Sequence, residues 1–347
     1  MRINGLFRAL ARFAVVVAVV GACVLAGAFK FGGEQAWWAE LLRFAPYPVY
    51  LLPALVALGL SMWLGWRWRV VAVIAVVLVL TVNMGLELHK GDAGSGRFRL
   101  MTYNAKAYLA AQQRGGVESI AWEVALHDPD ILVMQDAERL LQPPISTLEP
   151  VRAMFRGRQV FESGQYIVAS RMPLRGCTDG DISFVGEQHH YVRCVVTVHG
   201  IEIDLATAHL LSPREGLNAT RHERLGGIDE WKENFSNRLS QARALAGDLG
   251  RLMGATGRPT ILAGDLNARE DSPVVGMLRA TGLRDAFSSA GTGYGYTHGH
   301  SLRPHISFNR IDHILVSPTL GVSDCFVGSD KPSEHRAVIA DLLVKRD

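Results

Sequence analysis

Residues 259–267 read PTILAGDLN, a short apolar run that ends in two polar residues, Asp265 and Asn267. A run of this length is typical of a buried strand, and the end of such a strand projects its side chains to one edge of a sheet. The pattern recurs in RIDHIL, where Asp312 precedes an apolar run, and in SEHR, where Glu334 and His335 precede AVIADL. The sequence therefore predicts carboxylate, amide and imidazole groups at strand ends.

Three more polar residues follow apolar runs nearer the N-terminus: Asn104 after LMTY, Asp136 after DILVMQ and His209 after DLATA. Each one alone has a structural explanation, because a single Asn or Asp after a strand is usually a turn or cap residue. Together they form a set that suits hydrolysis of a phosphate ester. Carboxylates hold a hard divalent cation, one of them can take a proton from water, and imidazole and amide groups neutralise phosphoryl charge.

The chain from residue 98 onward mixes strand patterns with helical ones. Helical spacing covers residues 117–127 and 235–253, and a Gly-rich linker at residues 91–97 precedes the first strand. The expected strands share short apolar or alternating patterns, at residues 98–103, 130–134, 166–169, 191–198, 201–208, 259–263 and 311–316. Hairpins with interspersed helices predict an α+β sandwich, in which two packed sheets are flanked by helices.

These segments, in this order, resemble the endonuclease/exonuclease/phosphatase superfamily, and we expect its domain at residues 98–347. The resemblance rests on TYN, PDILVMQD, VASRMP, TAHL, GDLN, RIDHIL and SEHR, of which the last three in succession are the most specific. It implies a four-layered α/β/β/α sandwich of the DNase I-like kind. It also implies hydrolysis of a phosphoester bond with a divalent ion, Mg²⁺ first and Mn²⁺ or Ca²⁺ as alternatives.

The resemblance assigns catalytic roles residue by residue. Asp265 resembles the residue that orients or deprotonates the attacking water, and Asn267 looks like a phosphate contact. His209 is similar to a contact of the phosphate or the leaving group. His335 resembles the histidine that stabilises the pentacovalent phosphorus, and Asp312 the residue that holds its ring, since such a histidine needs an acceptor to fix its tautomer.

Asn104, Asp136 and Glu334 resemble the metal side of the family site, with two departures. The family usually has Gln-Glu where this chain has Gln135-Asp136, and Ser-Asp-His where it has Ser-Glu-His at residues 333–335. One carboxylate is a methylene shorter and the other a methylene longer. We hypothesise that both face one cation and that the two changes compensate. The alternative is a weakened site, because a displacement of about 1 Å can cost about 10²-fold in rate.

Three charge-free runs lie in the first ninety residues, at positions 13–29, 44–66 and 70–86. A membrane-spanning helix needs about 20 apolar residues, with a lower limit near 17. Tryptophan and tyrosine residues cluster at the edges of the runs, as they do at membrane interfaces. The sequence therefore predicts a membrane region over residues 1–90 with three transmembrane helices, at about 13–29, 46–66 and 70–87.

Flanking charges predict the orientation of these helices. Arg2, Arg8 and Arg12 precede the first run, and Arg67 and Arg69 separate the second from the third. The positive-inside rule then keeps the N-terminus in the cytoplasm. Three crossings place the large domain on the extracytoplasmic face of a bacterial plasma membrane. Cleavage of the first run as a signal peptide, after the small-residue pattern at residues 26–28, is an alternative that leaves the domain on the same side.

The distribution of charge and the order of the predicted regions restrict the classes of substrate that we expect. The chain has 36 Lys and Arg against 33 Asp and Glu, but residues 1–90 hold 8 of the basic and 3 of the acidic ones. The large domain is therefore slightly acidic, which disfavours a long polyanion such as nucleic acid. The layout resembles membrane-anchored bacterial proteins of the teicoplanin-resistance type, which implies the bilayer as partner and a phosphorylated or diphosphorylated lipid as substrate. Extracellular nucleic acid, a soluble phosphoester and a non-catalytic binding role remain alternatives.

Other histidines and the cysteines carry weaker signals. His189 and His190 form one pair, and His298, His300 and His305 lie in a Gly-rich loop; they are solvated loop residues, substrate contacts or ligands of a second metal. Cys177 and Cys194 flank an expected turn. Facing strands in an oxidising compartment favour a disulfide, and two buried thiols are the alternative.

Overall fold

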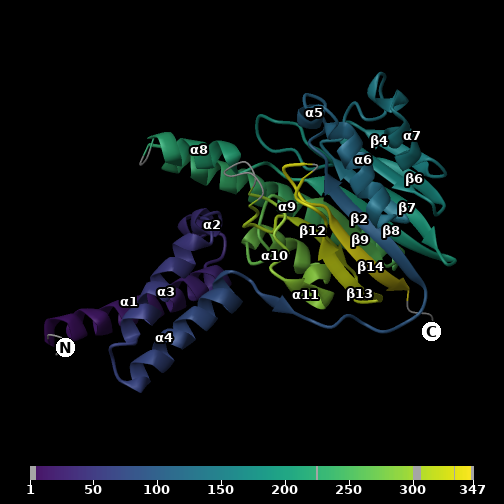
Figure 1. Ribbon diagram of the computed structural model, residues 1–347. Helices are drawn as coiled ribbons and strands as arrows, with labels where there is room; N and C mark the ends of the chain where they lie inside the picture. The colour runs from purple at the N-terminus through teal and green to yellow at the C-terminus, as the bar shows by residue number, and fades with distance from the viewer. Residues whose placement is uncertain (1–4, 224–225, 300–305, 332, 345–347) are drawn as a thin grey trace. The chain divides into compact units, whose positions relative to one another are not determined.

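The computed structural model describes residues 5–223, 226–299, 306–331 and 333–344 (Figure 1). It divides into two compact units, one up to Glu87 and a larger one from Leu88 onward. The predicted boundary between membrane region and domain lies close to this division. His300 and His305 fall outside the described residues.

The described part of the first unit, from residue 5 to residue 86, consists of helices joined by short turns. Its elements are α1 (Gly5–Phe31), α2 (Trp37–Arg43), α3 (Pro48–Ser61) and α4 (Trp66–Leu78), which continues as a π-helical turn over Val79–Asn83. Among the residues that the structure describes, two helices are long and apolar enough to cross a membrane, Gly5–Phe31 and Trp66–Asn83. Both helices begin before the predicted spans. They include Arg8 and Arg12 in the first case and Arg67 and Arg69 in the second, because a charged residue does not by itself end a helix.

The structure does not support the middle one of the three predicted spans. Helix α3 has 14 residues, which at 1.5 Å per residue is about 21 Å against a hydrocarbon core of about 30 Å. The run at residues 44–66 lacks charge but is not one helix. Pro48 stands at the first turn, where its missing N–H is tolerated, and the helix ends at Ser61, followed by a turn before Trp66. Absence of charge therefore overestimated the helix length.

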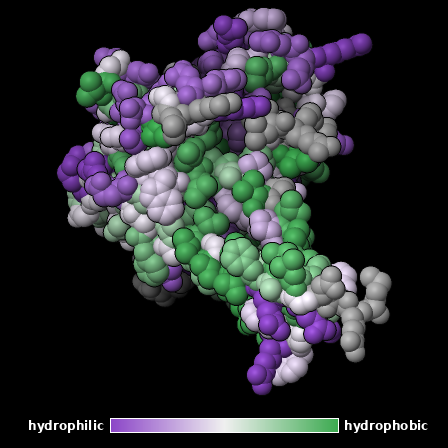
Figure 2. Space-filling view, turned by 90° about the vertical axis from the view of Figure 1, so that its left-hand side faces the viewer, coloured by the Kyte–Doolittle hydropathy of each residue, from purple (hydrophilic) through white to green (hydrophobic). Residues whose placement is uncertain are grey.

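Small side chains pack the interior of the helical unit. Val15 of α1, Ala57 of α3 and Ala72 of α4 are buried together. The outward-facing side chains are large and apolar, and among the described residues they include Phe13, Val17, Val20, Val24, Leu52, Leu55, Val73, Ile74 and Val77. Figure 2 shows hydrophobic residues gathered on the surface of these helices. Small side chains therefore lie inside this unit and large apolar ones lie outside, a pattern that is compatible with a membrane anchor.

The larger unit contains two six-stranded sheets. The first has the order β13 (Leu320–Val327), β14 (Val338–Val344), β2 (Arg97–Asn104), β3 (Ile131–Gln135), β5 (Tyr166–Ser170) and β4 (Gln159–Ser163). The second has the order β10 (Arg284–Asp285), β12 (Asp312–Val316), β9 (Thr260–Asp265), β8 (Ile201–His209), β7 (His190–Val198) and β6 (Leu174–Asp181). The short strands β1 (Glu87–Leu88) and β11 (Thr292–Gly293) lie outside these sheets.

Helices connect and cover the strands. They are α5 (Ala107–Ala110), α6 (Gly116–His127), the 3-10 turn Ile145–Thr147, α7 (Glu149–Phe155), α8 (Arg214–Glu223), α9 (Ile228–Thr256), α10 (Pro273–Arg279) and α11 (Ala286–Ala290). The long helix α9 buries one apolar face, with Leu245 and Leu249 fully covered, and Tyr191 of β7 donates to Asp248 of α9 over 3.3 Å.

The hydrophobic core follows from the two-residue period of the strands. Leu100 and Val133 of the first sheet face Leu205 and Ile261 of the second in one buried cluster. The alternate residues of the first sheet, such as Leu132, pack outward in a cluster with residues of α6 and α7. Strand side chains therefore bury both faces, and the prediction of a two-sheet α+β sandwich flanked by helices is confirmed.

Strand directions bring the polar ends together. Strands β2 and β3 are parallel, as are β8 and β9, so that the carboxyl ends of each pair meet at one edge. Strands β5 and β14 run antiparallel to the first pair, and β12 runs antiparallel to β9. These antiparallel strands begin at the edges where the parallel ones end. Each sheet therefore presents strand ends and strand beginnings at the same edge.

Two further contacts of the large unit involve the paired cysteines and the expected linker. Cys177 of β6 and Cys194 of β7 form a disulfide across an antiparallel pair. In the expected linker, Asp92 receives the backbone N–H of Val322 over 3.0 Å and pairs with Arg284 over 2.8 Å. The segment before β2 is therefore held against the domain and is not a free tether.

Candidate active site

Asp265 occupies the centre of the polar cluster, at the end of β9. Its Oδ1 accepts the backbone N–H of Asn267 over 2.9 Å, and its Oδ2 accepts the amide of Asn104 over 2.9 Å. The Nε2 atoms of His209 and His335 lie 3.4 and 3.8 Å from the same Oδ2. Burial, and then the negative charge of Asp312, raise the pKa of Asp265. A carboxylate of raised pKa is a stronger base than one in water.

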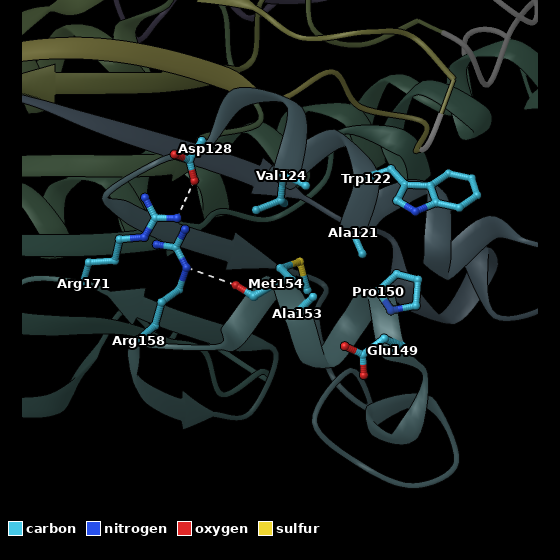
Figure 3. A pocket seen from close by; sticks show the side chains of 11 residues that line it. Ala121, Trp122, Val124, Asp128, Glu149, Pro150, Ala153, Met154, Arg158 and Arg171 are labelled. Atoms are coloured by element: carbon cyan, nitrogen blue, oxygen red, sulfur yellow. Dashed lines mark hydrogen bonds and ion pairs between the residues drawn. The ribbon is translucent and has the colours of Figure 1, made fainter.

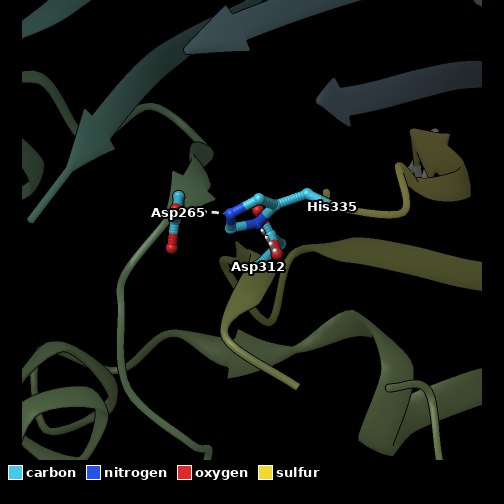
Figure 4. Close-up of side chains that lie close together, drawn as sticks. All are labelled: Asp265, Asp312 and His335. Carbon is cyan, nitrogen blue, oxygen red and sulfur yellow. Dashed lines mark hydrogen bonds and ion pairs between the residues drawn. The ribbon is translucent and has the colours of Figure 1, made fainter. Parts of the chain in front are cut away.

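Asp312 and His335 form a second buried pair beside Asp265 (Figure 4). Asp312 begins β12 directly opposite Asp265 in the antiparallel register. The Nδ1 atom of His335 lies 2.9 Å from Oδ2 of Asp312, while Nε2 is directed toward Asp265. Burial works to lower the pKa of His335, but the charges of Asp312 and Asp265 outweigh it and the pKa is raised. The imidazole is thus positioned to carry positive charge or to donate a proton.

Asp136, one residue beyond β3, faces two basic groups. Its Oδ2 is paired with the ammonium of Lys106, and its Oδ1 lies 3.5 Å from Nδ1 of His209. Burial would raise the pKa of Asp136, but His209 and then Lys106 outweigh it, so the pKa lies well below its usual range. Sequence reasoning missed Lys106 because it lies two residues beyond the end of β2.

Two residues that sequence reasoning missed hold His209 in place. Oε1 of Gln165 accepts from Nδ1 of His209 over 2.6 Å, and the hydroxyl of Tyr166 accepts the backbone N–H of His209 over 2.9 Å. Both residues lie at the start of β5. Because β5 is antiparallel to β3, the residues that reach the site precede this strand and do not follow it.

Asn267 is fixed by its backbone surroundings. It adopts a left-handed conformation with φ of 48°, and its side-chain amide donates to the carbonyl of Leu210 over 2.8 Å. Arg238 of α9 donates to the carbonyl of Asn267 over 3.1 Å. These contacts hold the turn that follows Asp265. The assignment of Asn267 as a phosphate contact stays a prediction.

Glu334 and Asp136 each pair with a basic residue, but not with the same one. Its Oε2 lies 3.0 Å from Nη2 of Arg214 in α8, and its side chain is 29% exposed. The hypothesis that Asp136 and Glu334 compensate on one cation therefore has to explain two carboxylates that each already have a basic partner. Neighbouring Ser333 instead donates its hydroxyl to the carbonyl of Asn104 over 2.9 Å, which ties this loop to β2.

The other histidines divide between the site and the surface. The ring of His298 lies 4.6 Å from that of His335, centre to centre, so that His298 borders the site. His189 lies 3.0 Å from Glu187 in an exposed turn, and the ring of His190 packs on Tyr166 at 5.2 Å.

The fit of a divalent cation differs between the two sides of the site. Within the described residues, Asp265, Asp312 and His335 each offer one ligand atom, all within 4.8 Å of one another. Oδ1 of Asp312 is buried and has no hydrogen-bond partner in that part of the chain, which suits a ligand atom. On the other side, the carboxylate of Asp136 already holds an ammonium. The assignment of Asn104, Asp136 and Glu334 as ligands stays a prediction, and a cation on Asp136 does not fit while Lys106 is in place.

A surface groove between α6 and α7 shares no residue with this cluster (Figure 3). Trp122 and Pro150 line one part of it, and Arg158 and Arg171 lie together at the other, with Asp128 paired to Arg171. This groove is therefore separate from the polar cluster at the strand ends.

Comparison with known proteins agrees with the two-sheet fold. The Endonuclease/Exonuclease/phosphatase family matches residues 101–335. Similar solved structures include truncated TDP2 of Caenorhabditis elegans, with a TM-score of 0.52 and 18% identity over 72% of this chain and 98% of that one. A mannosyl-6-phosphatase of Bacteroides thetaiotaomicron has a TM-score of 0.52 and 17% identity, over 71% and 99%. The human Nocturnin catalytic domain has a TM-score of 0.51 and 17% identity, over 71% and 93%. No curated protein sequence matches the chain.

Proposed function

The chain belongs to the Endonuclease/Exonuclease/phosphatase family, and we propose that it is a membrane-tethered, metal-dependent phosphoesterase that hydrolyses a phosphate or diphosphate ester of a lipid. The observation that carries the proposal is the convergence of His209, His335 and Asn104 on one carboxylate, Asp265, at the edge of two sheets. Donors and an acceptor arranged in this way suit in-line attack of water on phosphorus.

Each side chain has a chemical part in that reaction. Asp265 orients the water and accepts its proton as the new P–O bond forms. His335, whose pKa is raised by the charge of Asp312 against the effect of burial, stabilises the charge on the phosphoryl oxygens, and His209 contacts the phosphate or the leaving oxygen as the old P–O bond breaks. A divalent cation, Mg²⁺ with Mn²⁺ or Ca²⁺ as alternatives, would supply further positive charge, and Asp265 and Asp312 are the described carboxylates placed to hold it.

A lipid substrate is supported by the character of both units. The helical unit exposes large apolar side chains around a small-residue interior, as lipid-embedded helices do. The large unit is slightly acidic, so an extended polyanion gains little from it. An enzyme tethered to a bilayer meets phosphorylated headgroups at high local concentration.

The substrate test compares three phosphoesters on the full chain in vesicles. We expect Mg²⁺-dependent phosphate release from a polyprenyl diphosphate carried in phosphatidylcholine vesicles, at a rate at least tenfold above that from p-nitrophenyl phosphate. EDTA should abolish the release and added Mg²⁺ restore it. Nicking of plasmid DNA without lipid turnover would identify a nuclease. Inertness on all three substrates, together with tight binding to a partner, would identify a binding protein.

An extracytoplasmic location for the large unit is supported by its disulfide, since paired cysteines persist in oxidising compartments. The location can be tested with single cysteines in a Cys23→Ala background, because Cys325 is buried. Val185→Cys reports on a hairpin position that is 98% exposed. We expect a membrane-impermeant maleimide to label it in intact bacterial cells.

The matched variant Arg67→Cys reports on the opposite side of the bilayer. We expect it to be labelled only after permeabilisation, because Arg67 and Arg69 lie at the start of the apolar helix Trp66–Asn83 and favour the cytoplasmic side of that crossing. With the middle span withdrawn, the proposed location rests on the orientation of this one helix and not on three crossings. Labelling of Val185→Cys only after permeabilisation would contradict the proposed orientation.

A further inference from the structure

Lys106 lies inside the site but has no part in the mechanism above. It follows Asn104 by two residues, its side chain is only 15% exposed, and its ammonium is paired with Asp136. Among the described residues, Asp136 is the hydrogen-bond partner of its Nζ. An ammonium has three N–H donors, so two stay available to an anion that enters the site.

The backbone is built to hold this pair. Lys106 and Asp136 both adopt the left-handed region, with φ of 45° and 46°. Residues other than glycine take this conformation rarely, and it persists where surrounding contacts impose it. Here the backbone N–H of Lys106 donates to Oδ1 of Asn104 over 3.2 Å, and that of Ala107 donates to the carbonyl of Asp136 over 2.8 Å. Two strained turns are thus joined at the point where their side chains meet.

The charges make the pair stable without an added ion. A lysine ammonium is charged near neutral pH, and here it faces the carboxylate of Asp136. The ammonium therefore stays charged beside its carboxylate. A divalent cation on the same carboxylate would stand against a positive group a few ångströms away, and it would have to displace that group to bind.

A phosphate bound at Asp265 comes within the reach of this ammonium. His209 connects the two carboxylates, since its Nδ1 lies 3.5 Å from Asp136 and its Nε2 lies 3.4 Å from Asp265. Resting on the function proposed above, we propose that Lys106 is the fixed cation on the Asp136 side of the site and binds a phosphoryl oxygen of the substrate. Asp136 then holds the ammonium in place and does not hold a divalent ion.

Metal binding tests this directly, without reference to turnover. Mn²⁺ binding to the full chain in detergent micelles is measured by electron paramagnetic resonance for the wild type, Asp136→Asn, Lys106→Met and the double variant. We expect Asp136→Asn to bind Mn²⁺ as the wild type does. Lys106→Met should gain one site, because it frees the carboxylate, and the double variant should lose that gain. Loss of a Mn²⁺ site in Asp136→Asn alone would overturn the proposal.

Phosphate binding provides the second measurement. We expect Lys106→Met to weaken the binding of inorganic phosphate by about 10- to 100-fold, as for loss of a hydrogen bond from a charged donor. Lys106→Arg should recover part of it. Lys232→Met is the matched control, since Lys232 also pairs with an aspartate, Asp229, but on an exposed helix surface. Equal phosphate affinity in Lys106→Met and Lys232→Met would overturn the proposal. Inertness of the wild type on every ester, with phosphate binding still dependent on Lys106, would remove the proposed function and leave this inference standing.

Discussion

Asp265→Asn is expected to lower the rate of phosphate release by about 10³-fold or more, which is in the range of losing a general base. The amide has nearly the volume of the carboxylate but cannot accept the proton of the attacking water. It also presents an N–H where Asn104 or the backbone N–H of Asn267 now donates. The measurement is kcat on the preferred ester under saturating Mg²⁺.

The same substitution is expected to leave stability unchanged or to raise it. A carboxylate whose folded pKa is raised costs stability at every pH above its unfolded value, because folding disfavours the charged form. Asp265→Asn removes that charge, which offsets the loss of one accepted hydrogen bond where the new N–H faces a donor, so the melting temperature should not fall at pH 7. A variant that is inactive yet at least as stable separates catalysis from folding, as is common for active-site carboxylates.

Asp204→Asn is the matched control for Asp265→Asn. Asp204 is buried in the neighbouring parallel strand β8, at the end away from the site, where it accepts from Thr256 over 2.8 Å. It also lies 3.5 Å from Arg258. We expect it to lower the melting temperature and to keep kcat within about twofold. If Asp265→Asn retained more than a tenth of wild-type kcat, Asp265 would not be the base.

Most strands were predictable because their apolar periods are local. The expected strand at 201–208 became β8, and that at 259–263 became β9, each within two residues. Polar residues that follow parallel strands could also be recognised. Asp265 and His209 end neighbouring parallel strands, and the register places them side by side. The rule that strand ends gather at one edge was therefore enough to bring these two together.

Other site residues could not be found by that rule. Gln165 and Tyr166 reach the site from the beginning of an antiparallel strand, where no preceding apolar run marks them. Lys106 depends on a left-handed turn, which its residue type does not indicate. The predicted span at residues 46–66 was too long for a related reason. Hydrophobicity measures solvent preference, whereas the length of a helix depends on where the backbone turns. In each case the missing information is the path of the chain after a regular element ends.

His335→Gln is expected to lower kcat by about 10²- to 10³-fold, as for losing a charged donor to the phosphoryl group. Asp312→Asn should lower kcat by a smaller factor, about 10-fold, because it leaves the imidazole in place but removes the charge that holds it. Asp312 lies 2.9 Å from Nδ1 of His335, and the charge of Asp312 raises the pKa of His335 against the effect of burial. The alkaline limb of the pH–kcat profile should therefore move to lower pH in Asp312→Asn, a shift that a purely structural role would not produce.

The double variant decides whether Asp312 acts through His335. If it does, Asp312→Asn adds little once His335 is already Gln, and the combined loss equals that of His335→Gln within about threefold. Coupling of this kind is expected for residues in direct contact, whereas independent sites multiply their effects. Multiplied losses would mean that Asp312 makes a separate contact with the substrate or with a cation, for which its buried, unpartnered Oδ1 would be the available atom among the described residues. Kinetics at matched pH on all four proteins therefore show whether Asp312 acts through His335 alone or also as a ligand of the cation.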